Sequence, residues 1–417
     1  MRILFLDAYF EPDQIAFTHL EKDLLEGLVK EGHYVEVVCP TPTRGGSEEI
    51  IQKYKKIKTE DLYDGHVHVT RFSAPREGKN PLIRALRYLW CNLRTYQIGK
   101  KAKNIDVIFS NSTPPTQGIT CSLVAKQLSK VYRRKVPFVY NLQDVFPDSL
   151  VNAKMTKKGS IAWKIGRIIE NYTYKQSDQI IVISLGIKQN IIKKGVPNEK
   201  IKVISNWIDL NNVRPVDRFD NQLFDEFQID RSKFVVLYAG NLGEAQGADI
   251  IIETAKELIS EKRIQFVIIG GGPKYKEIKE RIKKEKVSNI LIVRLRSQDQ
   301  ISDVYSMGDV ALITCKPGTG YASLPSKTWS IMACNTQIIA SFDIDSDLAD
   351  VLNDSGAGYC IEPGNPKTLE DAILTAFKNW RNIDTKTTDC RSYALCAASK
   401  DNCVKKYIDT FQNVVEK

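Results

Sequence analysis

Long apolar runs are absent from this 417-residue sequence. No stretch approaches the roughly 18 uninterrupted apolar residues that a membrane-spanning helix requires, so the sequence predicts no such helix. The N-terminal run 1–10 is short, contains Asp7 and lacks a small-residue cleavage site. It therefore predicts a first strand and not a signal peptide.

Metal-binding and nucleotide-binding signatures are also scarce. None of the four histidines stands at ligand spacing from another His or Cys, and the nine cysteines include no CxxC pair. The sequence therefore predicts no metal site, and it indicates reduced thiols in a cytoplasmic protein. GxGxxG and GxxxxGK[ST] do not occur, which argues against a dinucleotide oxidoreductase and a P-loop nucleotidase.

The chain does have an excess of basic residues, with a net charge of +10. Such a charge favours anionic partners, which include nucleic acid, anionic lipid and phosphorylated ligands. No zinc-finger, RNA-recognition or basic-zipper signature accompanies it, so nucleic acid is not an expected partner.

Two successive alternations of strand and helix organise the sequence. The first runs from an apolar strand at 1–8 to another at 201–205, and the second begins with a strand at 234–239. This order predicts an α/β protein with two doubly wound, Rossmann-like domains that face each other across an inter-domain cleft. We place these domains at residues 1–208 and 209–390. A final helical segment, 391–417, is expected to return to the first domain.

The segment Pro81–Lys103 has the pattern of a basic amphipathic helix. Its apolar residues share one face and its arginines and lysines occupy the others: Leu82, Ile83, Leu86, Leu89, Trp90 and Leu93 against Arg84, Arg87, Arg94, Lys100, Lys101 and Lys103. Such a helix can lie in an anionic membrane interface. The alternative is a helix that packs on the core with solvated arginines.

A glycine-containing loop follows the strand at 234–239. Its candidate ligand-binding residues are Gly240, Asn241, Gly243 and Gln246. Glycines allow backbone N–H groups to approach a phosphate closely, and the two amide side chains offer neutral hydrogen bonds.

Asp144 follows a predicted strand in the first half of the chain. In open α/β sheets, ligands bind at the carboxyl ends of the strands. A carboxylate at this position could act as a base or could bind sugar hydroxyls. The alternative is a helix cap or a turn, where Asp is common.

The stretch Gly318–Ala340 combines a turn-rich loop, a helix start and a strand. Pro325 suits the first helical position, Ser323 or Ser326 can cap the helix, and Lys327 follows at once. Unpaired N–H groups with a nearby lysine can bind an anion. The alternative is an ordinary helix start with a solvated lysine.

These motifs together carry a family resemblance. The segments GNLGEAQGAD, FVIIGGGPKY and GYASLPSKTWSIMACNTQIIA resemble the donor half of family 4 glycosyltransferases, which have the GT-B fold. The N-terminal segment YFEPDQIAFTHLEKDLLEGLVKEGHYVEVVCP resembles the acceptor half. YNLQDVFPDS and ISNWIDL resemble the subgroup that builds bacterial surface polysaccharides, including fucosamine transferases. The resemblance covers nearly the whole chain.

The resemblance implies that a sugar is transferred from a nucleotide donor, usually UDP-linked, with retention and without a metal or other cofactor. The sequence departs from the family in two places. An Arg and a Lys are common in the donor loop, where this chain has Asn241 and Gln246. Two glutamates eight residues apart are also common, and here Ala322 and Ser330 stand at those positions, so Ser330 replaces the residue that binds the ribose.

Charge balance then singles out other residues for the diphosphate. Its roughly two negative charges would be costly to leave unpaired in a closed site. Because Asn241 and Gln246 are neutral, we expect Lys327, Ser326 at the helix start, and either Arg294 or Arg296 to compensate, with Arg296 preferred.

The predicted function is transfer of a sugar, for which an N-acetylated aminosugar is our guess, from a UDP-sugar to a lipid-linked (polyprenyl-diphosphate) saccharide. This step would belong to capsule, O-antigen or exopolysaccharide assembly. We expect the protein to be cytoplasmic and attached to the anionic inner face of the cell membrane through Pro81–Lys103. Two alternatives remain: a UDP-N-acetylglucosamine 2-epimerase and an inactive nucleotide-sugar-binding subunit.

Overall fold

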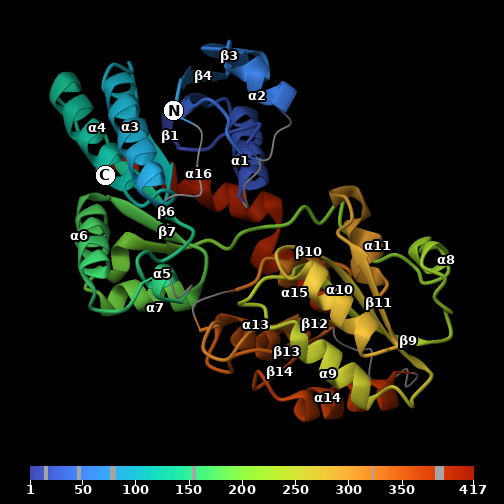
Figure 1. Cartoon of the computed structure of the whole chain (residues 1–417). Coiled ribbons are helices and arrows are strands. Elements are labelled where there is room, and N and C mark those ends of the chain that lie inside the picture. The colour runs from blue at the N-terminus through green and yellow to red at the C-terminus, as the bar shows by residue number, and fades with distance from the viewer. Residues whose placement is uncertain (14–16, 45–47, 76–80, 153–155, 322–323, 381–388) are drawn as a thin grey trace. The chain divides into compact units, whose positions relative to one another are not determined.

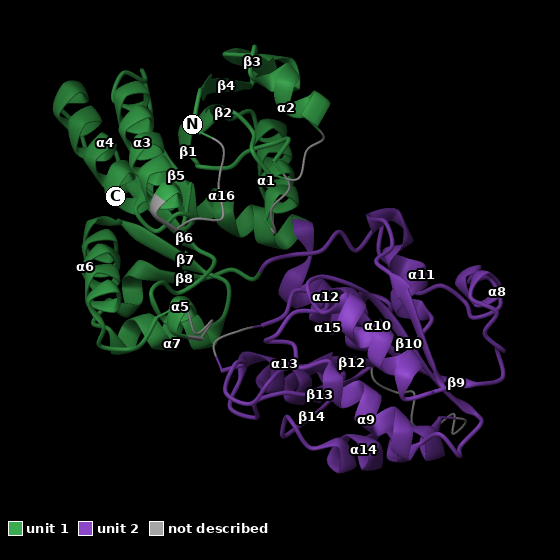
Figure 2. Ribbon diagram, in the orientation of Figure 1, with its two compact units in different colours: residues 1–205, 401–417 green, residues 206–400 purple. Residues whose placement is uncertain are grey.

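The computed structural model of the chain describes every residue except 14–16, 45–47, 76–80, 153–155, 322–323 and 381–388. The chain forms two compact units (Figure 2). Unit 1 contains residues 1–205 and 401–417, and unit 2 contains residues 206–400. The first segment of unit 1 ends at Ser205, three residues before the predicted domain boundary at 208. The chain returns to unit 1 at Asp401, whereas residue 391 was predicted.

Unit 1 is built on an eight-stranded sheet with the order β3-β4-β2-β1-β5-β6-β7-β8 (Figure 1). All neighbouring strands are parallel except β3, which is antiparallel to β4. The strands are β1 (Arg2–Leu6), β2 (Tyr34–Pro40), β3 (Thr59–Leu62), β4 (Val67–Phe72), β5 (Val107–Asn111), β6 (Phe138–Leu142), β7 (Gln179–Val182) and β8 (Ile201–Val203).

Helices connect these parallel strands, because a parallel pair cannot be closed by a tight turn. They are α1 (Thr18–Lys30), α2 (Glu48–Tyr54), α3 (Pro81–Gly99), α4 (Gln117–Tyr132), α5 (Asp148–Asn152), α6 (Ile161–Gln176) and α7 (Leu185–Lys193). Helix α4 packs against both α3 and α6. No described helix has the length and apolar character needed to cross a bilayer.

The last helix, α16 (Lys400–Glu416), completes the core of unit 1. Tyr407 and Phe411 are buried, and the Phe411 ring lies 5.3 Å from the ring of Phe109 in β5. The Tyr407 hydroxyl donates to Asn141 Oδ1 at 3.0 Å. The predicted C-terminal return is therefore made by α16, whereas α15 (Cys390–Ala398) stays in unit 2.

Unit 2 is built on a six-stranded, fully parallel sheet with the order β11-β10-β9-β12-β13-β14. The strands are β9 (Phe234–Asn241), β10 (Ile264–Gly271), β11 (Ile290–Arg294), β12 (Val310–Thr314), β13 (Gln337–Ser341) and β14 (Gly358–Ile361). The helices, besides α15, are α8 (Leu223–Glu226), α9 (Asp249–Glu257), α10 (Tyr275–Lys284), α11 (Ile301–Ser306), α12 (Lys327–Ala333), α13 (Asp347–Ser355) and α14 (Pro366–Asn379).

A buried polar cluster lies where β1 and β5 end in unit 1. The Asn111 Nδ2 donates to Glu21 Oε1 at 2.6 Å and lies 3.4 Å from Asp7 Oδ1. The second carboxyl oxygen of each acid is buried without a hydrogen-bond partner. Burial raises the pKa of Asp7 to about 7, and burial followed by the charge of Asp7 raises the pKa of Glu21 well above its usual range. The pair therefore retains protons near neutral pH.

This pair makes the stability of unit 1 depend on pH. Between about pH 4 and pH 7 the folded pair binds more protons than the unfolded chain, so stability falls as pH rises, by up to about 1.4 kcal/mol per pH unit for each proton. We predict that Glu21→Gln makes this fall shallower, as measured by urea-unfolding midpoints at pH 5, 6.5 and 8. Glu199→Gln, at an exposed carboxylate of the same unit, is the control. Equal slopes for Glu21→Gln and the unsubstituted chain would contradict the prediction.

Candidate functional site

The sheet of unit 2 changes its direction of winding between β9 and β12. The chain adds β10 and β11 on one side of β9 and then crosses to β12 on the other side. Ligands of doubly wound sheets bind outside the carboxyl ends of the strands at such a point. Residues 240–247, at the end of β9 and after it, and residues 315–321, after β12, lie there. The structure thus places the predicted glycine loop and the start of the lysine segment at one edge.

The loop after β9 is held by its own amide side chains. Gln246 Oε1 accepts from the Gly243 N–H at 3.1 Å and from Asn241 Nδ2 at 3.3 Å. Gly247 has a φ of +58°, and a Cβ there would lie 3.1 Å from the backbone nitrogen of Lys316. A glycine is therefore required where the loop approaches the chain that follows β12. Asn241 and Gln246 shape the loop in this structure.

The loop after β12 is folded around a carboxylate that sequence reasoning did not identify. Asp343 is buried, and its two oxygens accept from the Gly318 N–H at 2.9 Å and the Gly320 N–H at 2.6 Å. A Cβ on Gly320 would lie 2.5 Å from the Phe342 ring. The Lys316 N–H also donates to Ala245 O at 2.8 Å, which joins this loop to the glycine loop.

Lys327 is the first residue of α12, and its side chain reaches back to the end of β9. Its Nζ donates to Ala239 O at 3.2 Å and lies 4.1 Å from the centre of the Tyr238 ring. Within the described ranges, no carboxylate lies at ion-pair distance from this ammonium. Desolvation lowers the pKa of Lys327 from 10.5 to about 8. The structure thus places a partly buried cation beside Gly240.

The helix start differs from its prediction. Ser326 has helical backbone angles, is exposed, and makes no capping hydrogen bond with its side chain. Of the two predicted caps, Ser326 therefore does not act as one, and the first residue of the helix is Lys327 and not Pro325. Ser330 is buried in the second turn of α12. Ala322 and Ser323 lie outside the described residues.

Arg296 is not brought together with Lys327. It forms an ion pair with Glu226, and its guanidinium lies 4.8 Å from the centre of the Phe227 ring. Arg294, the alternative candidate, stacks on Tyr275 at 3.9 Å. Among the described contacts, neither arginine touches Gly240 or Lys327. Alternation along the strand could not show that each arginine has an aromatic partner of its own.

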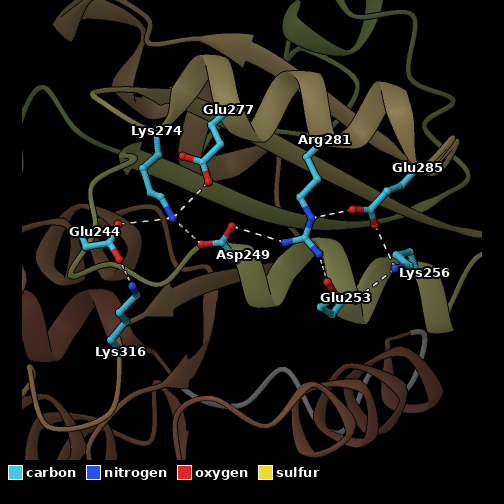
Figure 3. Close-up of polar contacts among 9 residues, drawn as sticks. All are labelled: Glu244, Asp249, Glu253, Lys256, Lys274, Glu277, Arg281, Glu285 and Lys316. Carbon is cyan, nitrogen blue, oxygen red and sulfur yellow. Dashed lines mark hydrogen bonds and ion pairs between the residues drawn. The ribbon is translucent and has the colours of Figure 1, made fainter.

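Two further lysines at this edge, Lys274 and Lys316, were missed from the sequence. They follow β10 and β12 and share Glu244, in a network that also contains Lys256, Arg281, Asp249, Glu253, Glu277 and Glu285 (Figure 3). The network has five carboxylates and four cations, so its positive charges are compensated. By contrast, the Lys327 ammonium has no carboxylate at ion-pair distance among the residues that the structure describes.

Asp144 lies in unit 1, two residues after β6. The residue is exposed. Desolvation by its neighbours raises the pKa of the Asp144 carboxyl. Hydrogen bonds from Ser149 and from the Val145 backbone lower the same pKa but do not outweigh the desolvation. A carboxylate with a raised pKa at the carboxyl edge of a sheet can accept a proton or bind hydroxyl groups.

A cavity of about 360 Å³ in unit 2 lies elsewhere. Its lining includes Phe234, Asp309 and Gln337, which stand at the amino-terminal ends of their strands or just before them. It is therefore at the opposite edge of the sheet from Lys327 and is not the candidate site.

Both halves of the chain match family models of glycosyltransferases. The family model of Glycosyltransferase Family 4 matches residues 22–212, and that of Glycosyl transferases group 1 matches residues 219–394. WcaI of Escherichia coli, named as a glycosyl transferase of colanic acid biosynthesis, is 24% identical over 425 residues, which cover 98% of this chain and 99% of WcaI. WbjE of Pseudomonas aeruginosa, named as a glycosyltransferase, is 26% identical over 304 residues, which cover 72% of this chain and 74% of WbjE.

Among solved structures, that of Anabaena HepE in complex with UDP resembles this chain with a TM-score of 0.70. The identity is 16%, and the match covers 99% of this chain and 100% of HepE. This likeness confirms the predicted fold, with two Rossmann-like units.

Because the Lys327 ammonium is desolvated, we predict that Lys327→Met stabilises unit 2. The folded pKa of about 8 lies below 10.5, so the charged lysine lowers stability by up to about 3 kcal/mol below pH 8, and stability recovers as pH rises from 8 to 10.5. Methionine keeps the length and the contact with Tyr238 but removes the charge. Thermal unfolding at pH 7 should show a higher midpoint for Lys327→Met.

Lys316→Met is the matched control, because Lys316 is already paired with Glu244. It should leave the midpoint unchanged or slightly lower. A lower midpoint for Lys327→Met at pH 7 would show that the lysine is structural.

Proposed function

This chain is a family 4 glycosyltransferase of the GT-B fold, and from that premise we propose that it transfers a sugar from a UDP-sugar to a lipid-linked saccharide. The transfer would proceed with retention at the anomeric carbon and would serve capsule, O-antigen or exopolysaccharide assembly, with an N-acetylated aminosugar as the first donor to test. The Lys327 ammonium carries the proposal, because it is partly buried at the ligand-binding edge and pairs with no described carboxylate.

A nucleoside diphosphate suits this cation. Its negative charges would take the place of the missing counter-ion, and the ion pair would be strengthened by desolvation. The complex of HepE with UDP supports a uridine nucleotide as the ligand. As the bond between sugar and phosphate breaks, negative charge grows on the leaving diphosphate, and a fixed ammonium stabilises that state most. We include no metal, because Lys327 supplies positive charge.

Asp144 is our candidate for the acceptor hydroxyl. It lies at the carboxyl edge of the sheet in the unit matched by the Glycosyltransferase Family 4 model. Its raised pKa suits a group that accepts a proton or a hydrogen bond from a sugar hydroxyl.

The first test is a panel of donors, UDP-N-acetylhexosamines first, incubated with membrane extracts and read by mass spectrometry. We predict that Lys327→Met lowers transfer about 100-fold, as expected when a group that stabilises developing charge is removed. UDP affinity, measured by isothermal titration, should also fall, and in the unsubstituted chain it should weaken as pH rises above about 8 and Lys327 loses its proton.

Lys262→Met, at an exposed residue between α9 and β10, is the control and should leave transfer unchanged. Full activity and donor affinity in Lys327→Met would overturn the assignment. An epimerised donor formed without any acceptor would indicate the epimerase instead. UDP binding without turnover of any donor would indicate the inactive binding subunit.

Helix α3 supports attachment to a membrane. Its apolar residues Ile83, Leu86, Leu89, Trp90 and Leu93 are between 45% and 66% exposed, so they do not pack on the core as the alternative prediction required. We call these five residues the apolar row. The helix ends at Gly99, and the side chain of Leu82 lies outside the described residues.

The neighbouring helices also carry exposed apolar residues. Leu123 and Val131 of α4 and three isoleucines of α6, at 161, 165 and 168, are also exposed. Helices α3, α4 and α6 carry no acidic residue except Glu170, which is buried and paired with Arg167 and Lys194. Exposed apolar side chains among basic residues match an anionic lipid surface. We therefore propose the inner face of the cell membrane as the partner.

We predict that the chain floats with vesicles of phosphatidylglycerol and less with vesicles of phosphatidylcholine. Leu86→Asp with Leu89→Asp should abolish flotation, because charged groups are costly to bury in lipid. Phe219→Asp, at a residue of unit 2 that is 78% exposed, controls for a general loss of surface apolarity. Equal flotation of the double variant and the unsubstituted chain would exclude α3 as the contact.

A further inference from the structure

The basic residues of the segment Pro81–Lys103 have different environments. Arg87 is 1% exposed, so its predicted place on the polar face of the helix is wrong. Arg94 and Lys100 are half-buried, and Lys101 is exposed. These last three residues line a cavity of about 510 Å³ in unit 1. The proposed transfer gives this cavity no role.

The cavity lies between the sheet and the end of α3. Two cross-strand pairs of β2 and β4 line one side of it: Glu36 with His68, and Val38 with Thr70. Alternate residues of a strand point to the same face of a sheet, so these side chains share one face. The other side is lined by α3 and the residues that follow it: Arg94, Gln97, Ile98, Lys100, Lys101 and Ala102.

This position separates the cavity from the candidate residue of the acceptor. Glu36 is the third residue of β2 and His68 the second residue of β4, so the cavity lies toward the amino-terminal ends of these strands. Asp144 follows the carboxyl end of β6 in the same sheet. A ligand in the cavity would therefore be distinct from an acceptor bound at the carboxyl edge.

Positive charge gathers in the cavity. Arg94 Nη1 donates to Gln97 Oε1 at 2.9 Å, and the Lys100 ammonium lies 5.1 Å from the centre of the Tyr96 ring. Of the carboxylates that the structure describes, none lies at ion-pair distance from Arg94, Lys100 or Lys101. The three cations therefore have no counter-ion of their own in the described structure.

The acidic groups at the cavity are already paired. Glu36 Oε1 lies 3.0 Å from Arg2 Nη1, and Asp61 Oδ1 lies 2.6 Å from Nδ1 of His68. Cations at the end of a helix also interact with its dipole, but that dipole amounts to only about half a negative charge. Three cations still leave positive charge in excess, so the cavity favours an anion.

The other polar groups of the lining suit hydroxyl groups. Glu36 has a second carboxyl oxygen besides the one that pairs with Arg2, Thr70 has a hydroxyl, and Gln97 has an amide. A carboxylate repels a bare phosphate, but it accepts a hydrogen bond from a hydroxyl. A phosphate ester that carries free hydroxyl groups suits both the cations and the carboxylate.

The apolar row of α3 leads directly to the cavity. Arg94 follows Trp90 by four residues, and Gln97 follows Leu93 by four residues, and residues at this spacing are neighbours on a helix. Trp90 and Leu93 are 45% and 50% exposed. A phosphate ester with an apolar chain would therefore contact both the cavity and the row.

We propose that this cavity binds a phosphate ester that carries free hydroxyl groups, with Arg94, Lys100 and Lys101 at the phosphate and Glu36 at a hydroxyl. The guanidinium fork matches phosphate oxygens, and the lysines add charge. The headgroup of a glycerol phospholipid and a free polyol phosphate share this chemistry. The site does not depend on the proposed transfer, and a lipid source would add headgroup recognition to the proposed membrane contact.

The test uses the full chain with Lys327→Met as background, so that the lysine beside Gly240 does not bind the probes. Glycerol 3-phosphate, inorganic phosphate and glycerol are titrated separately by calorimetry. We expect glycerol 3-phosphate to bind most tightly, inorganic phosphate less tightly and glycerol least. Arg94→Gln with Lys101→Gln should weaken glycerol 3-phosphate about tenfold, as expected when two contacts between charged groups near the surface are lost.

Lys130→Gln is the matched control, because Lys130 is an exposed lysine in the last turn of α4 and does not line the cavity. Lys101→Gln alone keeps the test informative if the double variant fails to fold, and it should weaken the probe about threefold. The proposal is overturned if glycerol 3-phosphate binds no more tightly than inorganic phosphate. It is also overturned if Lys101→Gln and the double variant bind glycerol 3-phosphate as tightly as the background chain does.

A second titration identifies the source of the ligand. Dihexanoyl phosphatidylglycerol is used below its micelle concentration, so that no bilayer is present. Binding that is tighter than that of glycerol 3-phosphate, and that loses this gain in Leu93→Ala, would assign a lipid headgroup whose chain lies along the apolar row. Equal affinities that are unaffected by Leu93→Ala would assign a free polyol phosphate.

Transfer assays with Lys327 restored separate this proposal from the proposed function. Transfer from a UDP-sugar by a chain that binds no glycerol 3-phosphate would reject the cavity as a site and leave the transferase intact. Binding that depends on Arg94 and Lys101, without transfer from any UDP-sugar, would reject the transferase and leave the site intact.

Discussion

Parallel strand pairing determines where this molecule can place a binding site. Because parallel strands cannot be joined by tight turns, each connection crosses the sheet, and all the strands of a parallel set end at one edge. In unit 1 the winding reverses between β1 and β5, and in unit 2 it reverses between β9 and β12. Loops from distant parts of the sequence meet at these two points, and the residues with unusual electrostatics lie at or near them.

The cations at these edges have two kinds of environment. Most cations are compensated nearby, as in the network around Lys274 and Arg281 or in the pair of Arg71 and Glu60. Lys327 instead lies against the Tyr238 ring and Ala239 O, without a described carboxylate at ion-pair distance. Exposed ion pairs contribute little to stability, whereas an uncompensated buried cation lowers it. Retaining such a cation at Lys327 is understandable if an anionic ligand supplies the counter-charge.

The sequence predicted the two sheets and the loop at Gly240 because apolar strands and glycines leave a local pattern. It could not predict the environment of Arg87. An amphipathic pattern identifies an apolar side of α3, but that side is exposed, and the helix is instead buried at Arg87, Cys91 and Thr95. Nor could it predict that Asp343 folds the loop after β12, or that Glu226 pairs with Arg296, since these contacts join residues 23 and 70 positions apart.

The neutral residues of the glycine loop can be understood in these terms. Gln246 accepts a hydrogen bond from the Gly243 N–H through its Oε1. Lysine has no acceptor atom, so a lysine at position 246 could not make this hydrogen bond. A charged residue there would add attraction for phosphate but would leave the loop without this internal hydrogen bond. The chain has instead a loop held by neutral amides and a cation supplied by α12, which reaches the same edge at Gly240. Charge and loop shape are thus provided by different segments, and the departure from the family pattern does not by itself remove the means to hold a diphosphate.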